Sequence, residues 1–314
     1  MKIPNSPILP ALFGRRTHKV RQTLGSRLFD ILNVLVLWGL VLFTLGPFLY
    51  ILFGSITEAD YYRVNGVALD PAHWSLASYE VLLSTASRLV PAFNVTLLTT
   101  VLGTGLGLMV TASLAFAVSR TELPGHNLLV WMLFFTMIFN GGMVPFYLVV
   151  DGLGLTNTIW AMVIPFLSDA WFVFILVKFF ESLPQELFDA ARIDGCSEVE
   201  LFFRIVLPLS KPVLATIGLF FAVYFWNQWF WPMVFVQDSQ LHPLQVVLRA
   251  ILSTMMPVVN PNAAVQQARQ LADMPPVEVM RMAAIVVTII PIAIVYPFLQ
   301  RYFVKGVLIG AVKE

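Results

Sequence analysis

The sequence predicts an all-α protein that crosses a membrane several times. Of its 314 residues, 58% are hydrophobic and only 12% are charged, which is about half the charged fraction of a typical soluble domain. Several stretches of about 20 residues carry almost no charge, and that length suits a helix crossing a bilayer core roughly 30 Å thick. The short alternating segments typical of a β-barrel are absent from the sequence.

Six stretches meet this criterion, so we expect six transmembrane helices. They cover residues 31–54, 91–119, 128–150, 159–180, 213–236 and 283–300. Together they define a membrane domain over 31–303, between a basic N-terminal segment, 1–30, and a C-terminal tail, 304–314. The first stretch is too long for the apolar core of a signal peptide, so we expect it to be retained as a span.

The positions of Lys and Arg predict the orientation. Six spans place both termini on one side of the membrane, and with cytoplasmic termini the inner segments hold 14 of the 19 basic residues. The other five lie in predicted outer segments: Arg63, Arg88, Arg249, Arg269 and Arg281. Because basic residues favour the cytoplasmic side, we expect a multi-pass protein with both termini in the cytoplasm.

Two predicted outer loops, 55–90 and 237–282, are long. The first either offers a docking surface or only connects two spans over the membrane surface. In the second, apolar residues at helical spacing predict a short helix at the membrane interface. These residues are Leu244, Val247, Leu248, Ile251 and Leu252.

The composition and motifs argue against several functions. A formal net charge of +1 gives no support for a nucleic-acid partner. Cys196 is the only cysteine, and the four histidines have no metal-ligand spacing, so we expect no metal site. The sequence shows no arrangement of a nucleophile with a general base, so we expect no catalytic residue. The G-x-x-x-x-G-K-[ST] phosphate loop is missing, so ATP would have to bind to another chain.

One charged, apparently helical segment interrupts the apolar sequence at 184–212, between the fourth and fifth predicted spans. Pro184 suits a first helical turn, and Gly195 suits the left-handed residue that ends a helix. Ser197 and Glu200 form a capping box that would start a second helix, which Pro208 would end. From these features alone, an ordinary amphipathic loop and a docking element for a partner are equally good interpretations.

This segment resembles the cytoplasmic EAA loop of permease subunits in bacterial ABC importers, whose pattern is E-A-A-x-x-D-G-A followed by I-x-L-P. The residues that match the pattern are Asp189, Ala190, Ala191, Asp194, Gly195, Ile205, Leu207 and Pro208. Asp189 replaces the usual Glu, and Cys196 replaces the usual Ala. The segments WNQWFWPMVFV, HPLQVVLRAIL and YFVKGVLIGAVKE extend the resemblance to carbohydrate-uptake permeases, with the maltose-type second subunit and the oligosaccharide permeases nearest.

The resemblance implies a MetI-like membrane fold and a complex with separate partners in the bacterial cell membrane. These are a second, different permease subunit, two ATP-binding subunits that use ATP and Mg²⁺, and an extracellular solute-binding protein. The transported substrate would be a carbohydrate. The matching residues would contact the ATPase, chiefly through Ala190, Ala191, Asp194 and Gly195, while Phe202 and Phe203 would pack behind them.

Five polar residues in the predicted spans are candidates for the substrate path: Asn140, Asp169, Tyr224, Asn227 and Gln228. Aromatic faces stack on sugar rings, and amides bond to sugar hydroxyls. Other roles remain open. Asn140 and its neighbouring glycines can mark close helix packing, Asp169 can be satisfied by a helix end or by the partner permease, and Tyr224, Asn227 and Gln228 can contact another subunit.

The main alternative is a secondary transporter driven by an ion gradient. Such a protein needs acidic or ion-binding sites in the membrane and usually an internal repeat. Asp169 is thin support for it, and the EAA-like segment would have no role. Five basic residues in the outer segments are too few to predict an anionic substrate.

Overall fold

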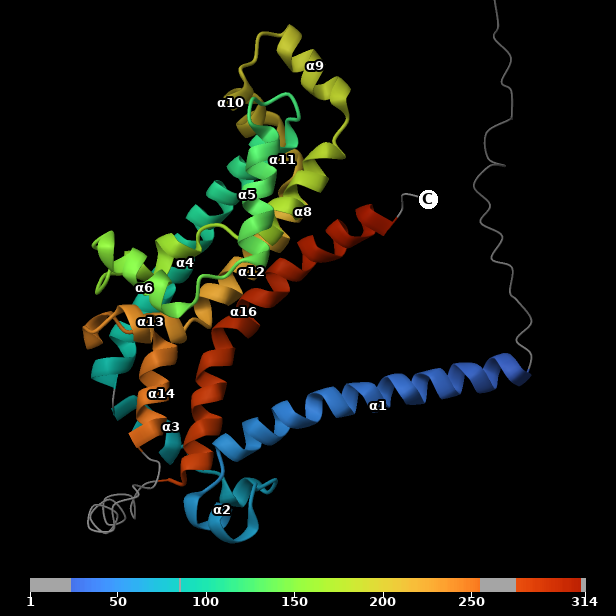
Figure 1. Cartoon of the computed structure of the whole chain (residues 1–314). Helices are drawn as coiled ribbons and strands as arrows, with labels where there is room; N and C mark the ends of the chain where they lie inside the picture. The colour runs from blue at the N-terminus through green and yellow to red at the C-terminus, as the bar shows by residue number, and fades with distance from the viewer. Residues whose placement is uncertain (1–23, 85, 255–274, 312–314) are drawn as a thin grey trace, which may run out of the picture. The chain divides into compact units, whose positions relative to one another are not determined.

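The computed structural model describes residues 24–84, 86–254 and 275–311 (Figure 1). These ranges are mostly helical, with one isolated β-bridge between Thr57 and Trp74. The chain divides into two compact units, Met1–Tyr50 and Ile51–Glu314. The predicted N-terminal segment 1–30 lies mostly outside the described residues.

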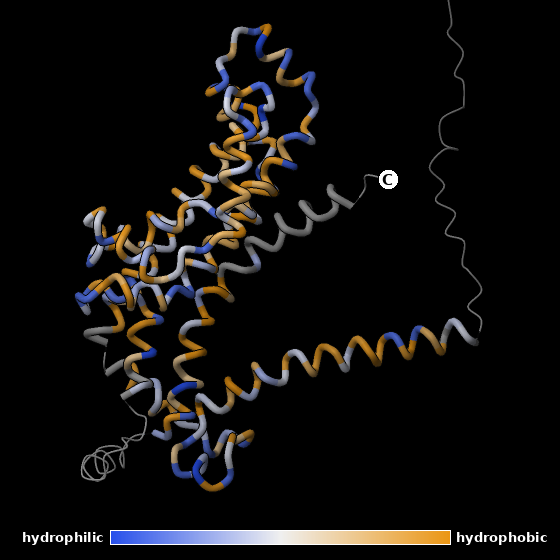
Figure 2. The backbone as a smooth tube through the Cα atoms, in the orientation of Figure 1, coloured by the Kyte–Doolittle hydropathy of each residue, from blue (hydrophilic) through white to orange (hydrophobic). Residues whose placement is uncertain are grey.

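In the first unit, the described residues form most of one apolar helix, α1 (Leu24–Ser55). Its stretch Leu28–Ser55 is long and apolar enough to cross a membrane, and it contains the first predicted span. Figure 2 shows hydrophobic residues along most of this helix.

The second unit begins with short elements in the predicted outer loop 55–90. They are α2 (Ala59–Asn65), a 3-10 turn η1 (Pro71–His73) and α3 (Ala77–Ser84). Part of this loop packs on the rest of the unit, because Leu82 is buried and the Tyr79 hydroxyl lies 2.8 Å from Ser55 Oγ. The second predicted span lies within α4 (Ala86–Ser119), and the sixth lies within α16 (Val277–Ala311).

The third, fourth and fifth predicted spans are each broken, and the sequence indicated an interruption only in the third, at Asn140 and its neighbouring glycines. The third consists of α5 (His126–Ile138) and α6 (Met143–Gly152), separated at Asn140 and its glycines. The fourth consists of α7 (Trp160–Val163), η2 (Ile164–Phe166) and α8 (Ala170–Glu181). The fifth consists of α12 (Lys211–Trp226) and α13 (Phe230–Phe235).

The breaks in the third and fourth predicted spans have local causes. Gly142 has a positive φ of +84°, which a glycine adopts without steric cost. Proline removes a backbone donor, and Pro165 lies in the 3-10 turn that precedes the break before α8. Within the described ranges, three helices are long and apolar enough to cross a membrane, or up to five if each bent pair is one span. Six spans therefore stays a prediction.

The predicted outer segment 237–282 contains η4 (Ser239–Leu241) and the predicted helix, α14 (Leu244–Thr254). Part of the apolar side of α14 packs on the protein, and a position at the membrane interface stays a prediction; the side chains of Ile251 and Leu252 lie outside the described residues. Leu244, Val247 and Leu248 are buried in a cluster with residues of α3, α4 and α16. The Leu244 N–H also donates to Thr96 Oγ1 of α4 at 2.8 Å.

Helix α4 is central to the second unit, because it contributes to all three hydrophobic clusters. Two of its glycines pack closely on α12. A Cβ on Gly103 would lie 2.5 Å from the Phe225 ring, and one on Gly107 would lie 3.2 Å from the Phe221 ring. Small residues allow such close approach of helices in membrane proteins.

Candidate functional site

The 184–212 loop has the helix, turn and helix that its sequence predicts. The first helix, α9 (Gln185–Ile193), ends in a left-handed glycine, Gly195, with φ +83°. The Cys196 N–H donates to the Ala191 carbonyl at 3.0 Å, and the Gly195 N–H donates to the Arg192 carbonyl at 3.0 Å. This pair of bonds is the Schellman arrangement, which satisfies carbonyls left open at the helix end.

The predicted capping box opens the second helix, α10 (Glu198–Leu201). Ser197 Oγ accepts the Glu200 N–H at 3.3 Å, and the Glu200 carboxylate accepts the Ser197 N–H at 3.1 Å. Hydrogen bonds from the Ser197 backbone and side chain favour the charged carboxylate and hold the pKa of Glu200 below its ordinary value. The box therefore sets a sharp turn between the two helices.

The second helix does not end at Pro208, contrary to the prediction. It continues through a π turn, η3 (Phe202–Val206), into α11 (Leu207–Leu209) and stops at Ser210. A proline cannot donate to the carbonyl four residues earlier and clashes with it, and the wider π turn relieves this conflict. The chain then bends by 84° into α12.

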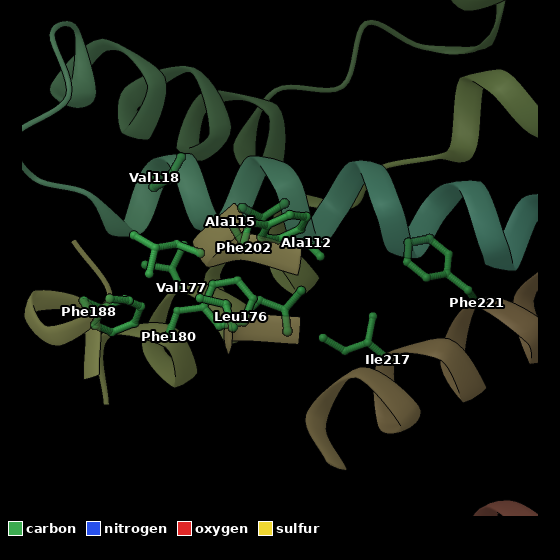
Figure 3. Close-up of a cluster of buried hydrophobic side chains, with 14 of the residues drawn as sticks. Ala112, Ala115, Val118, Leu176, Val177, Phe180, Phe188, Phe202, Ile217 and Phe221 are labelled. Carbon is green, nitrogen blue, oxygen red and sulfur yellow. The ribbon is translucent and has the colours of Figure 1, made fainter. Parts of the chain in front are cut away.

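The inner side of the 184–212 loop is part of the largest hydrophobic cluster (Figure 3). Phe188 and Phe202 are buried there with residues of α4, α8 and α12, among them Ala112, Leu176 and Ile217. The Phe202 ring lies 5.3 Å from the Phe116 ring of α4. One continuous core thus joins the loop to the predicted spans.

In two pairs of neighbouring residues that were expected to share a role, one side chain is buried and the other is exposed. Ala190 is exposed, whereas Ala191 is buried; Phe202 is buried, whereas Phe203 is 49% exposed. Consecutive residues on a helix point about 100° apart, so only one of each pair faces the core. Of the other matching residues, Ile205 and Leu207 are half-buried, and the exposed ones are Asp189, Asp194, Gly195 and Pro208.

Arg120, directly after α4, ties that helix to the loop. Its guanidinium lies 4.7 Å from the centre of the Phe116 ring and 4.3 Å from that of Phe188, distances at which cations are attracted to aromatic faces. Its Nε lies 3.9 Å from the Glu198 carboxylate. Burial lowers the pKa of Arg120, and the negative charge of Glu198 opposes that shift.

The charged contacts continue from Arg120 into α9. Arg192 forms an ion pair with Glu198 at 2.9 Å and lies 3.6 Å from the Asp189 carboxylate. Sequence reasoning counted Arg120 only toward the orientation and missed this role. Its one signal was its position, immediately after an apolar stretch of 31 residues.

The outward side of the loop carries apolar side chains that sequence reasoning also missed. Ile193 is 86% exposed, Val199 is 66% exposed and Leu187 is 42% exposed, although Figure 2 shows this region as largely hydrophilic. Leu187, Ala190 and Ile193 are three residues apart, so they share one stripe of α9. Exposed apolar groups gathered in this way are typical of a docking surface.

Two of the five substrate-path candidates lie at the breaks in the third and fourth predicted spans, where each accepts a hydrogen bond from a backbone N–H. Asn140 Oδ1 accepts the Gly142 N–H at 2.9 Å. Asp169 was predicted to lie within the fourth span, but the helix is broken there and Asp169 precedes α8. Its Oδ1 accepts the Trp171 N–H at 2.8 Å. The helix end that satisfies this carboxylate is thus that of α8 itself.

The other three candidates lie at the end of α12. Gln228 is buried and donates from Nε2 to the Tyr224 hydroxyl at 3.5 Å. Asn227 is exposed, and its Nδ2 donates to the Val223 carbonyl at 2.8 Å. The structure therefore brings Tyr224 and Gln228 together, while Asn227 bonds to its own helix.

An aromatic cluster connects the three broken spans. The Phe166 ring lies 5.9 Å from Phe146 of α6, 5.7 Å from Tyr224 of α12 and 6.0 Å from Trp231 of α13. Tyr224 and Trp231 lie on either side of the break in the fifth predicted span, and Phe166 precedes the break in the fourth. Aromatic side chains next to the breaks in the fourth and fifth predicted spans therefore pack together with Phe146 of the third.

Comparison with known proteins agrees with this architecture. Residues 125–309 match the family model described as binding-protein-dependent transport system inner membrane component. The chain is 40% identical to Protein LplC of Bacillus subtilis (strain 168) over 94% of this chain and 98% of that protein. It is 37% identical to the polygalacturonan/rhamnogalacturonan transport system permease protein YtcP of the same organism, over 92% and 99% of the two chains.

A solved structure has the same fold. It belongs to a bacterial ABC transporter involved in the import of the acidic polysaccharide alginate, with a TM-score of 0.78 and 32% identity over 90% of this chain and 98% of that one. The family match covers more than half of the sequence, and the apolar helices agree with a multi-pass protein of the cytoplasmic membrane. The chain therefore belongs to the binding-protein-dependent transport system inner membrane components, among the carbohydrate ABC transporter permeases with a MetI-like fold.

Proposed function

We propose that this chain is one of two permease subunits in an ATP-driven importer of carbohydrate, and that the 184–212 loop couples it to a separate ATPase. The observation that carries the proposal is the hydrophobic cluster shared by this loop and helices α4, α8 and α12. Close-packed side chains transmit displacement. A force on α9 therefore moves these helices together.

The proposed complex contains a second, different permease subunit, two ATP-binding subunits and an extracellular solute-binding protein. ATP and Mg²⁺ bind to the ATP-binding subunits. Both termini of this chain and the 184–212 loop lie in the cytoplasm, as its basic residues favour. The relatives named for polygalacturonan, rhamnogalacturonan and alginate support a carbohydrate as the substrate.

In this mechanism, ATP binding draws the two ATP-binding subunits together. Their movement pushes on the solvent-exposed side of α9. The loop and the attached spans then rock between outward-open and inward-open forms, as in other domain-closure transitions. The breaks near Asn140, Asp169 and Asn227 supply polar groups to the path, since broken helices place backbone polar groups beside a cavity. Tyr224 and Gln228 contribute a ring and an amide for a sugar.

An experiment on the outward side of α9 tests the coupling role. Replacing Ile193 by Lys places a charge on the proposed docking surface, and Val64→Lys on α2 is the matched control because the two side chains are 86% and 82% exposed. We expect I193K to lose the co-purifying P-loop ATPase and ATP-driven uptake, while V64K keeps both. An I193K complex that assembles and transports normally would sink the coupling proposal.

A further inference from the structure

A pocket of about 540 Å³ lies beside α14 and α16, in the predicted outer part of the second unit. Two of the five basic residues of the predicted outer segments, Arg249 and Arg281, line it. The other polar lining groups are the Trp229 ring and the side chains of Gln245, Ser253 and Thr288.

Helical spacing explains why these residues meet. Gln245, Arg249 and Ser253 are four residues apart, so they share one face of α14. Arg281 and Thr288 are seven residues apart, so they share one face of α16. The two helices are held in place beside the pocket by the buried pair of residues Leu248 and Ala284, which belong to one hydrophobic cluster.

Trp229 lines a third side of the pocket, and the chain next to it is hydrogen-bonded to α16. Trp229 follows the end of α12, and the neighbouring Trp226 donates from Nε1 to the Thr288 carbonyl of α16 at 3.2 Å. Apart from Trp229, the residues that line the pocket lie on two packed helices, which hold binding groups more accurately than loops do.

Arg249 is held ready for an anion. Its guanidinium lies 3.9 Å from the centre of the Trp229 ring, and this stacking orients the group through its face. The N–H donors lie in the guanidinium plane and are not used by the stacking. Their fork suits the two oxygens of a carboxylate.

The charge in the pocket has no counterion among the described residues. The ion pairs found within the described ranges include neither Arg249 nor Arg281. Two positive groups that line one pocket repel each other. An anion between them relieves this repulsion and accepts their hydrogen bonds.

We propose that this pocket binds the carboxylate of a uronic acid residue, so that the substrate is an acidic oligosaccharide and not a neutral one. Arg249 and Arg281 hold the carboxylate, while the amide of Gln245 and the hydroxyls of Ser253 and Thr288 suit sugar hydroxyls. The inference rests on the proposed function, because it takes the chain as a carbohydrate permease with α14 on its outer side.

The test uses the whole complex with its solute-binding protein, reconstituted in liposomes of neutral lipid. The probes are trigalacturonate, its methyl ester, which removes the charge, and a neutral trisaccharide. Variants are Arg249→Gln and Arg281→Gln. The control is Arg63→Gln on α2, which removes an arginine from another predicted outer segment, where it pairs with Asp60 at 3.1 Å.

We expect the wild-type complex to take up trigalacturonate in preference to the ester. Each pocket variant should lower trigalacturonate uptake by about tenfold or more, since hydrogen bonds to charged groups are among the strong ones. R63Q should stay within about twofold of the wild type. If a glutamine variant does not assemble, the lysine variant replaces it, and its loss of the bidentate fork should raise the KM for trigalacturonate.

The contrary outcomes separate the two proposals. Uptake of the neutral trisaccharide but not of trigalacturonate, or pocket variants that leave trigalacturonate uptake unchanged, refutes the acidic substrate alone. Absence of ATP-driven uptake of every carbohydrate refutes the proposed function as well. An anionic lipid headgroup offers similar chemistry. If the variants change only the response of ATPase activity to added phosphatidylglycerol, the pocket binds lipid and the inference is wrong.

Discussion

At the scale of single residues, the polar side chains of the predicted spans take their roles from the backbone next to them. Asn140 and Asp169 each accept a backbone N–H two residues later, at 2.9 Å and 2.8 Å. An N-cap needs an acceptor oxygen and does not need a net charge. The sequence places Asp169 in an apolar stretch, but only the break before α8 shows what the carboxylate binds.

Substitution of Asp169 tests whether it acts as a cap or as a titrating acid. Asp169→Asn keeps the acceptor, so we expect normal ATP-driven uptake and normal thermal stability. Asp169→Ala removes the acceptor and should lower stability by about 1 kcal/mol, measured by thermal unfolding of the purified complex. A folded D169N complex that cannot transport would show that the charge itself is needed.

Arg120 should matter more than an arginine that lies in solvent. Its side chain is 19% exposed and contacts two rings, whereas Arg204 is 72% exposed and lies 3.5 Å from Glu200. We expect Arg120→Gln to lower stability by about 1–2 kcal/mol and to speed proteolysis of the 184–212 loop. Arg204→Gln should change stability by less than about 0.5 kcal/mol. Equal effects of the two variants would contradict the anchoring role.

At the scale of elements, close packing between α4 and α12 depends on glycine at defined positions. Gly103 and Gly105 lie two residues apart on α4, but only Gly103 faces a ring of α12. A Cβ on Gly103 would lie 2.5 Å from Phe225, whereas one on Gly105 would meet nothing within 4 Å. Gly105 therefore serves as a control for substitutions of Gly103.

The two glycines should respond differently to the same substitution. Gly103→Ala forces the buried Phe225 ring to move, and overpacking of this kind costs roughly 1–3 kcal/mol. Gly105→Ala should be neutral or slightly stabilising, because alanine favours the helix. Thermal unfolding of the two purified complexes measures the difference, and a G103A complex as stable as G105A would show that α4 and α12 are not in contact as described.

At the scale of the whole molecule, α4 links the proposed docking surface on the 184–212 loop to the predicted substrate path within the second unit. This helix contributes to the cluster beneath the 184–212 loop, to the cluster beneath α14 and to the cluster beside α6 and α13. Movement of the loop therefore affects both ends of the unit. Such an arrangement suits a subunit driven by a partner from one side.

The energy source distinguishes this proposal from a secondary transporter. We expect uptake into liposomes to require ATP in the compartment that holds the ATP-binding subunits and to continue when ionophores collapse the ion gradients. Uptake that survives ATP removal but stops with ionophores would favour the gradient-driven alternative. The measurement is the initial rate of uptake of a labelled carbohydrate, with and without ATP and, in each case, with and without ionophores.

Several features of the protein follow from the sequence alone because their causes are local. The predicted spans 31–54, 91–119 and 283–300 lie within continuous helices, since the length of an apolar run is read directly from the chain. The turn at Gly195 and the capping box at Ser197 depend on residues within a few positions of each other. The exposure of Ile193 was missed because it depends on how α9 lies on the core.

Other features were decided by the tertiary structure, because they depend on which helix faces meet. Ala190 and Ala191 are neighbours, yet packing of α9 on the spans buries only the second. Arg249 and Arg281 lie on different helices, and no sequence pattern relates them. Contact between α14 and α16 brings both into one pocket, so two of the five basic residues of the predicted outer segments share a site that the sequence did not predict.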